Sequence, residues 1–309
     1  MNKIINEPTL GEEDIQLAKK YNYEYSLIVD KVVLPTFIIP ASYEFSRKLQ
    51  MRKGDICITS HPKSGSTWLT YTMLLLTRQG ETPKEKDLAE TFWWPSWGAD
   101  YMLTTEQLEA ASDPRLFRSH MPYQLAVGGV PVANPCKYIY IARHPKDVVC
   151  SYYNYAQDFD TYQGPWEDFL RLFMEGKTWF GDWFDHAKGW WNQRNADNVL
   201  FLWYEDMKFD FETETRKVTD FLNYPLSDEL LLKIKQATTF KSMKNNDLTN
   251  MKHVDETKKA PPKKYYRKGG VDTWKEQFTE TQSEQFDAWY ARRMQETGLA
   301  LDEAWLFNG

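Results

Sequence analysis

The sequence predicts a single α/β domain built on a parallel sheet with helices on both faces. Three short apolar, β-branched segments are expected to form strands: residues 55–60, 137–142 and 198–204. Each is followed by a segment with helical features, and these helices are expected over residues 67–79, 145–156 and 214–222. Strands that alternate with helices are joined by crossovers, so neighbouring strands run parallel and helices cover both faces.

Turn and cap residues mark the limits of these elements. The first strand is bounded by a glycine and a proline, and its helix should end near Gly80. Pro145 fits the first turn of the second helix, and Asp147 suits the positive end of that helix dipole. Aromatic residues at helical spacing within residues 179–191 indicate core or helix packing, with a binding box as the alternative. A last amphipathic helix is expected over residues 281–297.

The bulk composition is that of one globular domain spanning residues 1–309. The chain is 42% hydrophobic and 27% charged, which provides enough apolar residues for a packed core. Residues 1–30 are interpreted as an N-terminal extension, and the polar, lysine-rich residues 247–264 as a mobile loop. The net charge of −6 argues against a nucleic-acid partner, which requires a positive surface.

Nothing in the sequence indicates secretion or a membrane partner. The first residues lack the apolar core of a signal peptide, and no apolar stretch is long enough to span a bilayer. The three cysteines, Cys57, Cys136 and Cys150, form no CxxC pair, so we expect buried free thiols in a reducing compartment. These observations predict a cytoplasmic protein.

The segment PKSGSTW, residues 62–68, lies between the first strand and its helix and is typical of a phosphate-binding loop. Gly65 allows a backbone turn that a Cβ would resist, and the N–H groups at the helix start can bind an anion. Lys63 adds a positive charge, and three hydroxyls add donors: Ser64, Ser66 and Thr67. Because the lysine precedes the glycine, this is not a Walker A motif; an ordinary strand-to-helix turn is the alternative.

Three further groups could serve the same chemistry. Arg143 ends the second strand, and Ser151 lies two turns into the next helix, so both could reach one phosphate. The RKGG segment, residues 267–270, would suit a loop that closes over an anion, with a solvated turn as the alternative. His120 follows the strand-like residues 116–119, and histidine is the natural general base near pH 7, with a structural role as the alternative.

In order and spacing these segments resemble the cytosolic sulfotransferase family, whose sulfuryl donor is 3′-phosphoadenosine 5′-phosphosulfate (PAPS). The resemblance spans residues 30–295, and it rests on five segments: PKSGSTW at 62–68, YIARHPKDVVCSYY at 140–153, YEDM at 204–207, TTFKSMK at 238–244 and RKG at 267–269. It implies an α/β domain with about five parallel strands. It also implies in-line transfer of a sulfuryl group to a hydroxyl or amine of a small-molecule acceptor, with no metal required.

The resemblance assigns roles to individual residues. His120 would be the general base, and Lys63 would stabilise the charge that grows on the leaving phosphate. The implied PAPS-binding residues are Lys63, Ser64, Gly65, Ser66, Thr67, Trp68, Arg143, Ser151, Tyr204, Thr238, Thr239, Phe240, Met243, Arg267, Lys268 and Gly269. The residues expected at the acceptor are Phe37, Trp93, Trp94, Arg118, Tyr155 and Asp158.

The chain departs from the family pattern in three places. Arg118 stands where the family usually has lysine, and Asp272 and Thr273 replace a glycine and an aspartate after the RKG segment. The family's short dimer motif is matched by Lys275, Thr279 and Glu284, but Glu280 replaces its apolar centre. Because charges are depleted from interface cores, we expect a monomer or a weak homodimer.

Two other functions and two acceptor classes stay open at this stage. A nucleotide-dependent small-molecule kinase would need Mg²⁺ and so would respond to a chelator, and a non-catalytic nucleotide-binding relative would lack turnover. The variable segments 92–102 and 152–162 mix aromatic residues with the acids Asp100, Asp158 and Asp160, which favours a cationic acceptor. A neutral phenol held by the aromatic residues is the alternative.

Overall fold

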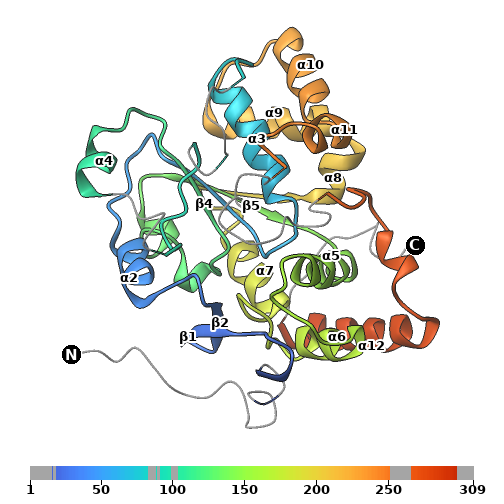
Figure 1. The fold of residues 1–309 in the computed structure, drawn as a ribbon. Coiled ribbons are helices and arrows are strands. Elements are labelled where there is room, and N and C mark those ends of the chain that lie inside the picture. Colours follow the sequence, from blue (N-terminus) through green and yellow to red (C-terminus); the bar gives the residue numbers. More distant parts are fainter. Residues whose placement is uncertain are drawn as a thin grey trace.

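Four parallel strands form the central sheet. The structure, a computed structural model, describes residue 16 and residues 19–82, 88, 91–98, 104–250 and 266–297. The strand order is β4-β3-β5-β6, made of β3 (Ile56–Thr59), β4 (Leu116–Ser119), β5 (Lys137–Ala142) and β6 (Val199–Trp203). Figure 1 shows helices on both sides of this sheet, which confirms the predicted parallel α/β class.

The register of the strands brings their carboxyl ends to one edge. Thr59 of β3 is paired with Ser119 of β4 on one side and with Tyr140 of β5 on the other. The segments that follow β3, β4, β5 and β6 therefore begin side by side, at the edge where parallel sheets usually bind ligands. These are the segments in which the sequence predicts chemistry.

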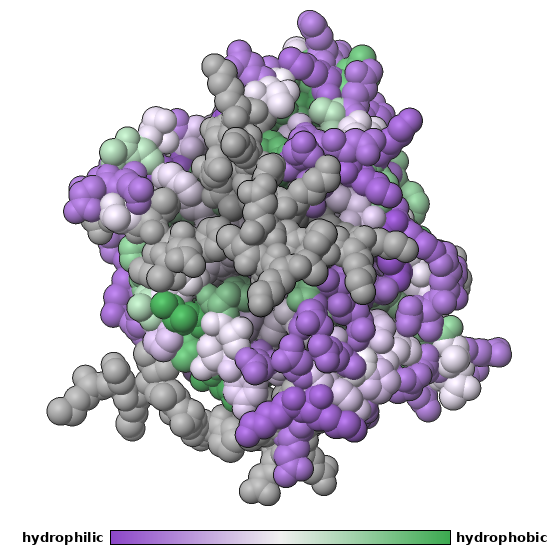
Figure 2. Space-filling model, in the orientation of Figure 1, coloured by the Kyte–Doolittle hydropathy of each residue, from purple (hydrophilic) through white to green (hydrophobic). Residues whose placement is uncertain are grey.

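Side chains alternate along β5 and divide the core in two. Tyr138 and Tyr140 face one hydrophobic cluster, while Ile139 and Ile141 face the other. The tyrosine face packs against α5 (Pro145–Asp158), α6 (Trp166–Met174), α7 (Trp183–Trp191) and α12 (Glu280–Thr297). The isoleucine face packs against α3 (Ser66–Thr77), α8 (Tyr204–Phe209), α9 (Phe211–Leu222), α10 (Asp228–Ala237) and α11 (Phe240–Lys244). The outer surfaces over α10 and α12 are largely hydrophilic (Figure 2), as expected for helices that cover a sheet.

The sheet is narrower than expected. Within the described residues the central sheet has four strands in place of about five. Beside β4 the described residues form an isolated parallel bridge between Trp93 and Phe117. The Trp93 N–H donates to the Leu116 carbonyl at 2.9 Å, and the Arg118 N–H donates to the Trp93 carbonyl at 2.9 Å. Pro95, two residues after Trp93, has no N–H with which to continue the ladder, so the pairing stops there.

A hairpin near the N-terminus was not predicted. It joins β1 (Tyr25–Val29) to β2 (Val32–Pro35) through Asp30 and Lys31, whose φ angles of 47° and 65° are those of a tight hairpin turn. Ahead of it, Tyr23 is buried and stacks on Trp179 with ring centroids 4.8 Å apart. Part of the segment interpreted as an N-terminal extension therefore packs against the domain.

The remaining segments connect these layers. They are α2 (Pro40–Lys48), α4 (Thr105–Ala110) and the short 3₁₀ helices η3 (Tyr123–Leu125), η4 (Pro131–Ala133) and η6 (Thr273–Glu276). Helix α7 begins at Trp183, after residue 179, because Phe180 and Gly181 have φ angles of 71° and 80° and Asp182 caps the helix start. Of residues 247–264, those up to 250 are described and include the buried Thr249, while 251–264 lie outside the described part.

Two expectations about the chain as a whole can be compared with the structure. Cys57, Cys136 and Cys150 are buried and free of disulfide bonds, as expected. None of the helices in the described part of the chain is long and apolar enough to cross a membrane.

Candidate active site

A cavity of about 420 Å³ opens at the carboxyl edge of the sheet. Side chains from the segments after all four parallel strands line it. Of the residues assigned from the sequence to catalysis, to PAPS or directly to the acceptor, all but Ser64 and Trp93 line this cavity. The tertiary structure thus brings together segments that are more than two hundred residues apart in the chain, such as those of Phe37 and Gly269.

The loop after β3 is shaped by unusual backbone angles. Lys63 and Gly65 have φ angles of 68° and 99°, so the chain turns sharply just before α3 begins at Ser66. A Cβ at residue 65 would lie 2.5 Å from the Tyr204 ring, so only glycine fits both the angle and the space. Beneath this turn the Ser64 hydroxyl is buried and has no hydrogen-bond partner among the described residues. The loop therefore carries the features of a site for an oxygen-rich anion.

The Lys63 ammonium lies in a positively charged part of the cavity. Its Nζ is 4.3 Å from the centre of the Tyr155 ring. Burial, together with the nearby Arg118 and Arg143 guanidinium groups, lowers the pKa of Lys63 to about 7. This cluster of cations is costly unless an anion binds between them.

Arg143 joins the loop after β3 to the chain near the C-terminus. Its Nη1 donates to the Lys63 carbonyl at 3.2 Å and its Nη2 to the Gly270 carbonyl at 3.0 Å. The Tyr204 hydroxyl donates to the neighbouring Gly269 carbonyl at 3.0 Å. The Nε of Arg143 and the indole N–H of Trp68 are buried donors without a partner among the described residues, although both residues line the cavity. These unused donors fit a ligand that brings acceptors, such as a phosphate group.

The buried Asp147 carboxylate holds the RKG-containing segment against α5. It accepts hydrogen bonds from the N–H groups of Asp272 and Trp274, both at 3.0 Å, and from the Thr273 hydroxyl at 2.8 Å. Asp272 has a φ of 59°, an angle that glycine adopts freely and that aspartate tolerates better than most residues. The substitution of this family glycine is therefore compatible with the turn.

An aromatic region lies at one end of the cavity. Trp68 meets Tyr204 edge-on at 5.5 Å and stacks over Phe211 at 5.7 Å, and Phe240 meets Tyr266 at 5.6 Å. These rings can hold a flat heteroaromatic base. The cavity-lining residues Met207, Lys208, Phe211 and Lys235 were missed from the sequence. For Met207 the available signal was its place in the YEDM segment at residues 204–207.

His120 comes directly after β4 and faces the cavity. Its Nδ1 is 2.8 Å from the Ser60 carbonyl, and because a carbonyl only accepts, Nδ1 carries the proton and Nε2 keeps its lone pair. Burial, and next the Arg118 cation, hold the pKa of His120 well below its usual value. The ring lies between Trp94 and Phe180, with centroids 5.0 and 5.4 Å away. The imidazole is therefore neutral and basic at Nε2 at neutral pH.

Arg118 connects His120's strand to the start of α3. Its Nη2 donates to the hydroxyls of Ser66 at 2.7 Å and Thr67 at 2.8 Å, and its guanidinium lies 4.6 Å from the Trp94 ring centre. A planar guanidinium can make all these contacts simultaneously in fixed directions. A lysine ammonium is a point charge and would hold them with less directionality. Arg118 therefore lies between the phosphate loop and the aromatic half of the cavity.

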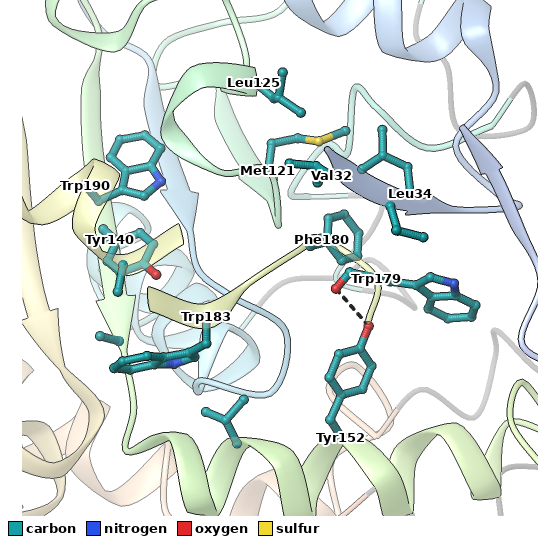
Figure 3. Packing of buried hydrophobic residues seen from close by; sticks show 14 of the residues in the cluster. Val32, Leu34, Met121, Leu125, Tyr140, Tyr152, Trp179, Phe180, Trp183 and Trp190 are labelled. Carbon is teal, nitrogen blue, oxygen red and sulfur yellow. Dashed lines mark hydrogen bonds between the residues drawn. The ribbon is translucent and has the colours of Figure 1, made fainter. Parts of the chain in front are cut away.

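The half of the cavity around His120 is aromatic. Its rings are Phe37, Trp94, Trp97, Tyr155, Phe159, Trp179 and Phe180. Figure 3 shows Trp179 and Phe180 beside β2, where the Tyr152 hydroxyl donates to the Trp179 carbonyl at 3.3 Å. Neither residue was assigned to the site from the sequence, because the aromatic residues of 179–191 were interpreted mainly as packing.

Strand geometry decides which of two neighbouring tryptophans reaches the cavity. Trp94 meets His120, whereas Trp93 is turned the other way and packs edge-on against Phe117 at 5.6 Å. Neighbouring side chains of an extended segment point to opposite sides, so both cannot line one cavity. Trp93, expected at the acceptor, is therefore not part of this lining.

Of the acids expected near the acceptor, one lines the cavity. Asp158 does so from the last turn of α5. Asp160 does not line the cavity and accepts a hydrogen bond from Gln163 at 2.7 Å, and Asp100 lies outside the described residues. Within the described part of the chain, no three His, Cys, Asp or Glu side chains form a group that could hold a metal ion.

The fold and the cavity define a class of protein: a parallel α/β group-transfer enzyme with a phosphate loop opposite a basic histidine. Comparison with known proteins narrows this class. The Sulfotransferase domain family matches residues 53–298, and this chain belongs to that family. It is accordingly a sulfotransferase.

Relatives and solved structures agree with this assignment. The chain is 37% identical to sulfotransferase 1B1 of Canis lupus familiaris over 265 residues, covering 84% of this chain and 89% of the relative. It is 33% identical to human sulfotransferase 1C2, covering 87% and 94%. Mouse sulfotransferase SULT7A1 complexed with PAP superposes with a TM-score of 0.71 at 28% identity, covering 87% and 94%. Retinol dehydratase in complex with retinol and PAP shares the fold, with a TM-score of 0.82 at 21% identity and coverage of 94% and 97%.

Proposed function

We propose that this enzyme transfers a sulfuryl group from PAPS to a hydroxyl or amine of a small molecule, with His120 as general base. The observation that carries this proposal is the pairing, in one cavity, of a cationic phosphate loop with a histidine whose Nε2 is unprotonated. The PAP-bound mouse relative supports the choice of nucleotide. The unused donors of Arg143 and Trp68 fit such a ligand.

Different residues around the cavity would bind different parts of PAPS and of the acceptor. The start of α3 and Lys63 would hold the 5′-phosphosulfate and stabilise the charge that grows on the leaving phosphate. Arg143, Ser151 and Arg267 would bind the 3′-phosphate, and the aromatic rings near Trp68 would hold the adenine. His120 would take the proton of the attacking acceptor through Nε2. PAPS itself supplies the sulfuryl group.

The donor assignment predicts a selective thermal shift. The product nucleotide 3′,5′-ADP should raise the Tm. At a concentration a hundredfold above its Kd, binding increases the free energy of unfolding by about 2.7 kcal/mol. Adenosine 5′-phosphate should raise it far less, because it lacks the 3′-phosphate and leaves the buried Nε of Arg143 without an acceptor. Differential scanning fluorimetry measures both shifts. Equal shifts would remove the assignment of PAPS as the donor.

We further propose that the acceptor carries a positive charge beside the group that is sulfated. Asp158 lines the cavity in its aromatic half, close enough to Lys63 to favour that residue's charged form. Aromatic faces also attract cations, by about 0.5–2 kcal/mol per contact. A neutral phenol held by the rings alone is the second candidate, favoured by the predominance of aromatic over acidic side chains.

The two acceptor classes are separated by one substitution. For a phenol with an aminoethyl side chain, Asp158→Asn should lower kcat/KM about fivefold, equivalent to about 1 kcal/mol. A phenol of similar size with a neutral alkyl chain should be unaffected. Asp160→Asn is the matched control, because Asp160 lies two residues away but outside the cavity lining. Preference for the neutral phenol, unchanged in Asp158→Asn, would remove the cationic acceptor.

We also propose a monomer or weak homodimer. Glu280 is exposed at the first position of α12, and Lys275 pairs with Asp272 of its own chain at 3.2 Å. Light scattering at micromolar concentration should give the monomer mass. Glu280→Val, which restores the apolar centre of the family's dimer motif, should increase the dimer fraction. A tight wild-type dimer that Lys275→Ala or Glu284→Ala dissociates would show that the glutamate does not prevent dimerisation.

The proposed location is the cytoplasm. The three buried free thiols are compatible with a reducing compartment. Fractionation of the source cells, with the chain detected by antibody, tests this; recovery in a secreted or membrane fraction would contradict it.

A further inference from the structure

We propose that His186 and Tyr140 form a hydrogen-bonded pair that fixes the position of His120, so that His186 is a positioning residue for sulfuryl transfer. The inference rests on the proposed role of His120 as the base. His186 comes from α7 and Tyr140 from β5, and neither lines the cavity. Their contribution would therefore act through the main chain of His120 and not through a ligand.

The main chain of His120 needs support because the strand has already ended. The last bond between β3 and β4 is from the Ser60 N–H to the Ser119 carbonyl, at 3.3 Å. The next carbonyl, that of His120, lies beyond the ladder. His186 meets it with Nε2 at 3.0 Å. This bond supplies the carbonyl with a donor and ties the catalytic segment to α7.

The hydrogen-bond roles of His186 follow from its two partners. A carbonyl only accepts, so Nε2 must carry the proton. Nδ1 is then an acceptor, and the Tyr140 hydroxyl donates to it at 2.9 Å. His186 is fully buried, and burial lowers its pKa to about 4, while burial raises the pKa of Tyr140. Both groups therefore stay neutral at neutral pH, and the tyrosine selects one tautomer of the histidine.

Without its hydroxyl, residue 140 would no longer favour the His186 tautomer that carries its proton on Nε2. Nδ1 of His186 would lack a donor and could take up the proton itself. The bare Nε2 would then face the carbonyl oxygen of His120, and the two lone pairs would repel. His120 would keep its bond to the Ser60 carbonyl but lose its second anchor. Small displacements of a catalytic group cost rate steeply, on the order of a hundredfold for 1 Å.

The experiment compares two tyrosines of the same strand. Tyr138 and Tyr140 are both fully buried and face the same cluster, but the Tyr138 hydroxyl donates to the Val127 carbonyl at 2.7 Å, away from His186. We expect Tyr138→Phe and Tyr140→Phe to lower the Tm by similar amounts. Only Tyr140→Phe should lower kcat, by about tenfold, with the acceptor KM and the Kd for 3′,5′-ADP within about twofold of wild type. Equal kcat values for the two variants would overturn the proposal.

A second pair of variants tests His186 directly. In His186→Gln the side-chain amide can still donate to the His120 carbonyl, whereas in His186→Leu nothing can. We expect the glutamine variant to keep at least about tenfold more kcat than the leucine variant. Equal activity in folded proteins would contradict the positioning role. Two-dimensional ¹H–¹⁵N spectra of the histidine rings should show the Nε2–H form of His186 in wild type and its loss in Tyr140→Phe; retention of this form would also contradict it.

The outcomes separate this inference from the proposed function. If His120→Ala retains turnover, the base role fails, whatever the tyrosine variants do. If His120→Ala abolishes turnover but Tyr140→Phe matches Tyr138→Phe, the base role stands and the positioning role alone fails.

Discussion

His120→Ala is expected to lower kcat by about 10²- to 10⁴-fold, the range that a positioned general base contributes. The reason is the fixed orientation of the ring, since Nδ1 is bound to the Ser60 carbonyl and Nε2 is left to accept the acceptor's proton. The alanine variant should still bind 3′,5′-ADP, because His120 belongs to the acceptor half of the cavity and contacts Trp94 and Phe180. Steady-state kinetics and the nucleotide-induced Tm shift measure the two properties separately.

The same residue predicts the pH dependence of turnover. Because burial and Arg118 hold the pKa of His120 well below its usual value, the basic form persists at neutral pH. We expect kcat to stay level as the pH falls from 8 to 6.5 and to decrease only at lower pH. Near-normal kcat of His120→Ala at neutral pH would contradict the base role, and loss of the Tm shift in that variant would indicate a structural defect instead.

Lys63→Ala is expected to weaken both transfer and nucleotide binding. Loss of one preorganised donor at the site of developing charge typically costs about 10²- to 10³-fold in kcat. The Kd for 3′,5′-ADP should rise as well, because Lys63 contributes its charge before the reaction begins. Lys63→Met is the matched control for the aliphatic stem and should behave like the alanine variant. If Lys63→Met kept normal kcat and Kd, the ammonium would have no role.

Because the pKa of Lys63 is lowered, its contributions to nucleotide affinity and to the Tm should both depend on pH. In the free enzyme the ammonium begins to lose its proton near pH 7, so affinity for an anion through Lys63 should fall as the pH rises above about 7. That decrease should be smaller in Lys63→Met, which isothermal titration at pH 6.5 and 8.5 can measure. The pKa of Lys63 is lower in the folded protein than in the unfolded chain. The charged form of this lysine therefore destabilises the ligand-free fold, and it does so fully at pH values below the folded-state pKa. Lys63→Met should therefore raise the Tm most below pH 7.

Local signals in the sequence determined the class and most of the site of this protein. The apolar segments at 56–59, 137–142 and 199–203 form the predicted strands, and α5 begins at Pro145, as the proline indicated. After the third strand the prediction was wrong in detail, because α8 begins at Tyr204 and α9 at Phe211, ahead of the helix expected from residue 214. The phosphate loop could be recognised because its glycine, lysine and hydroxyl residues lie within seven consecutive positions. Such signals depend on interactions within a few consecutive residues. They can therefore be recognised without knowing which distant segments come into contact.

Only the tertiary structure decided which side chains meet. It turned Trp94 toward His120 and Trp93 away, and it stopped the sheet at four described strands where Pro95 ends the pairing. It also brought Tyr140 and His186, forty-six residues apart, within one hydrogen bond of each other. These contacts depend on strand register and helix packing between distant segments, and no spacing within a single segment of the sequence contains that information.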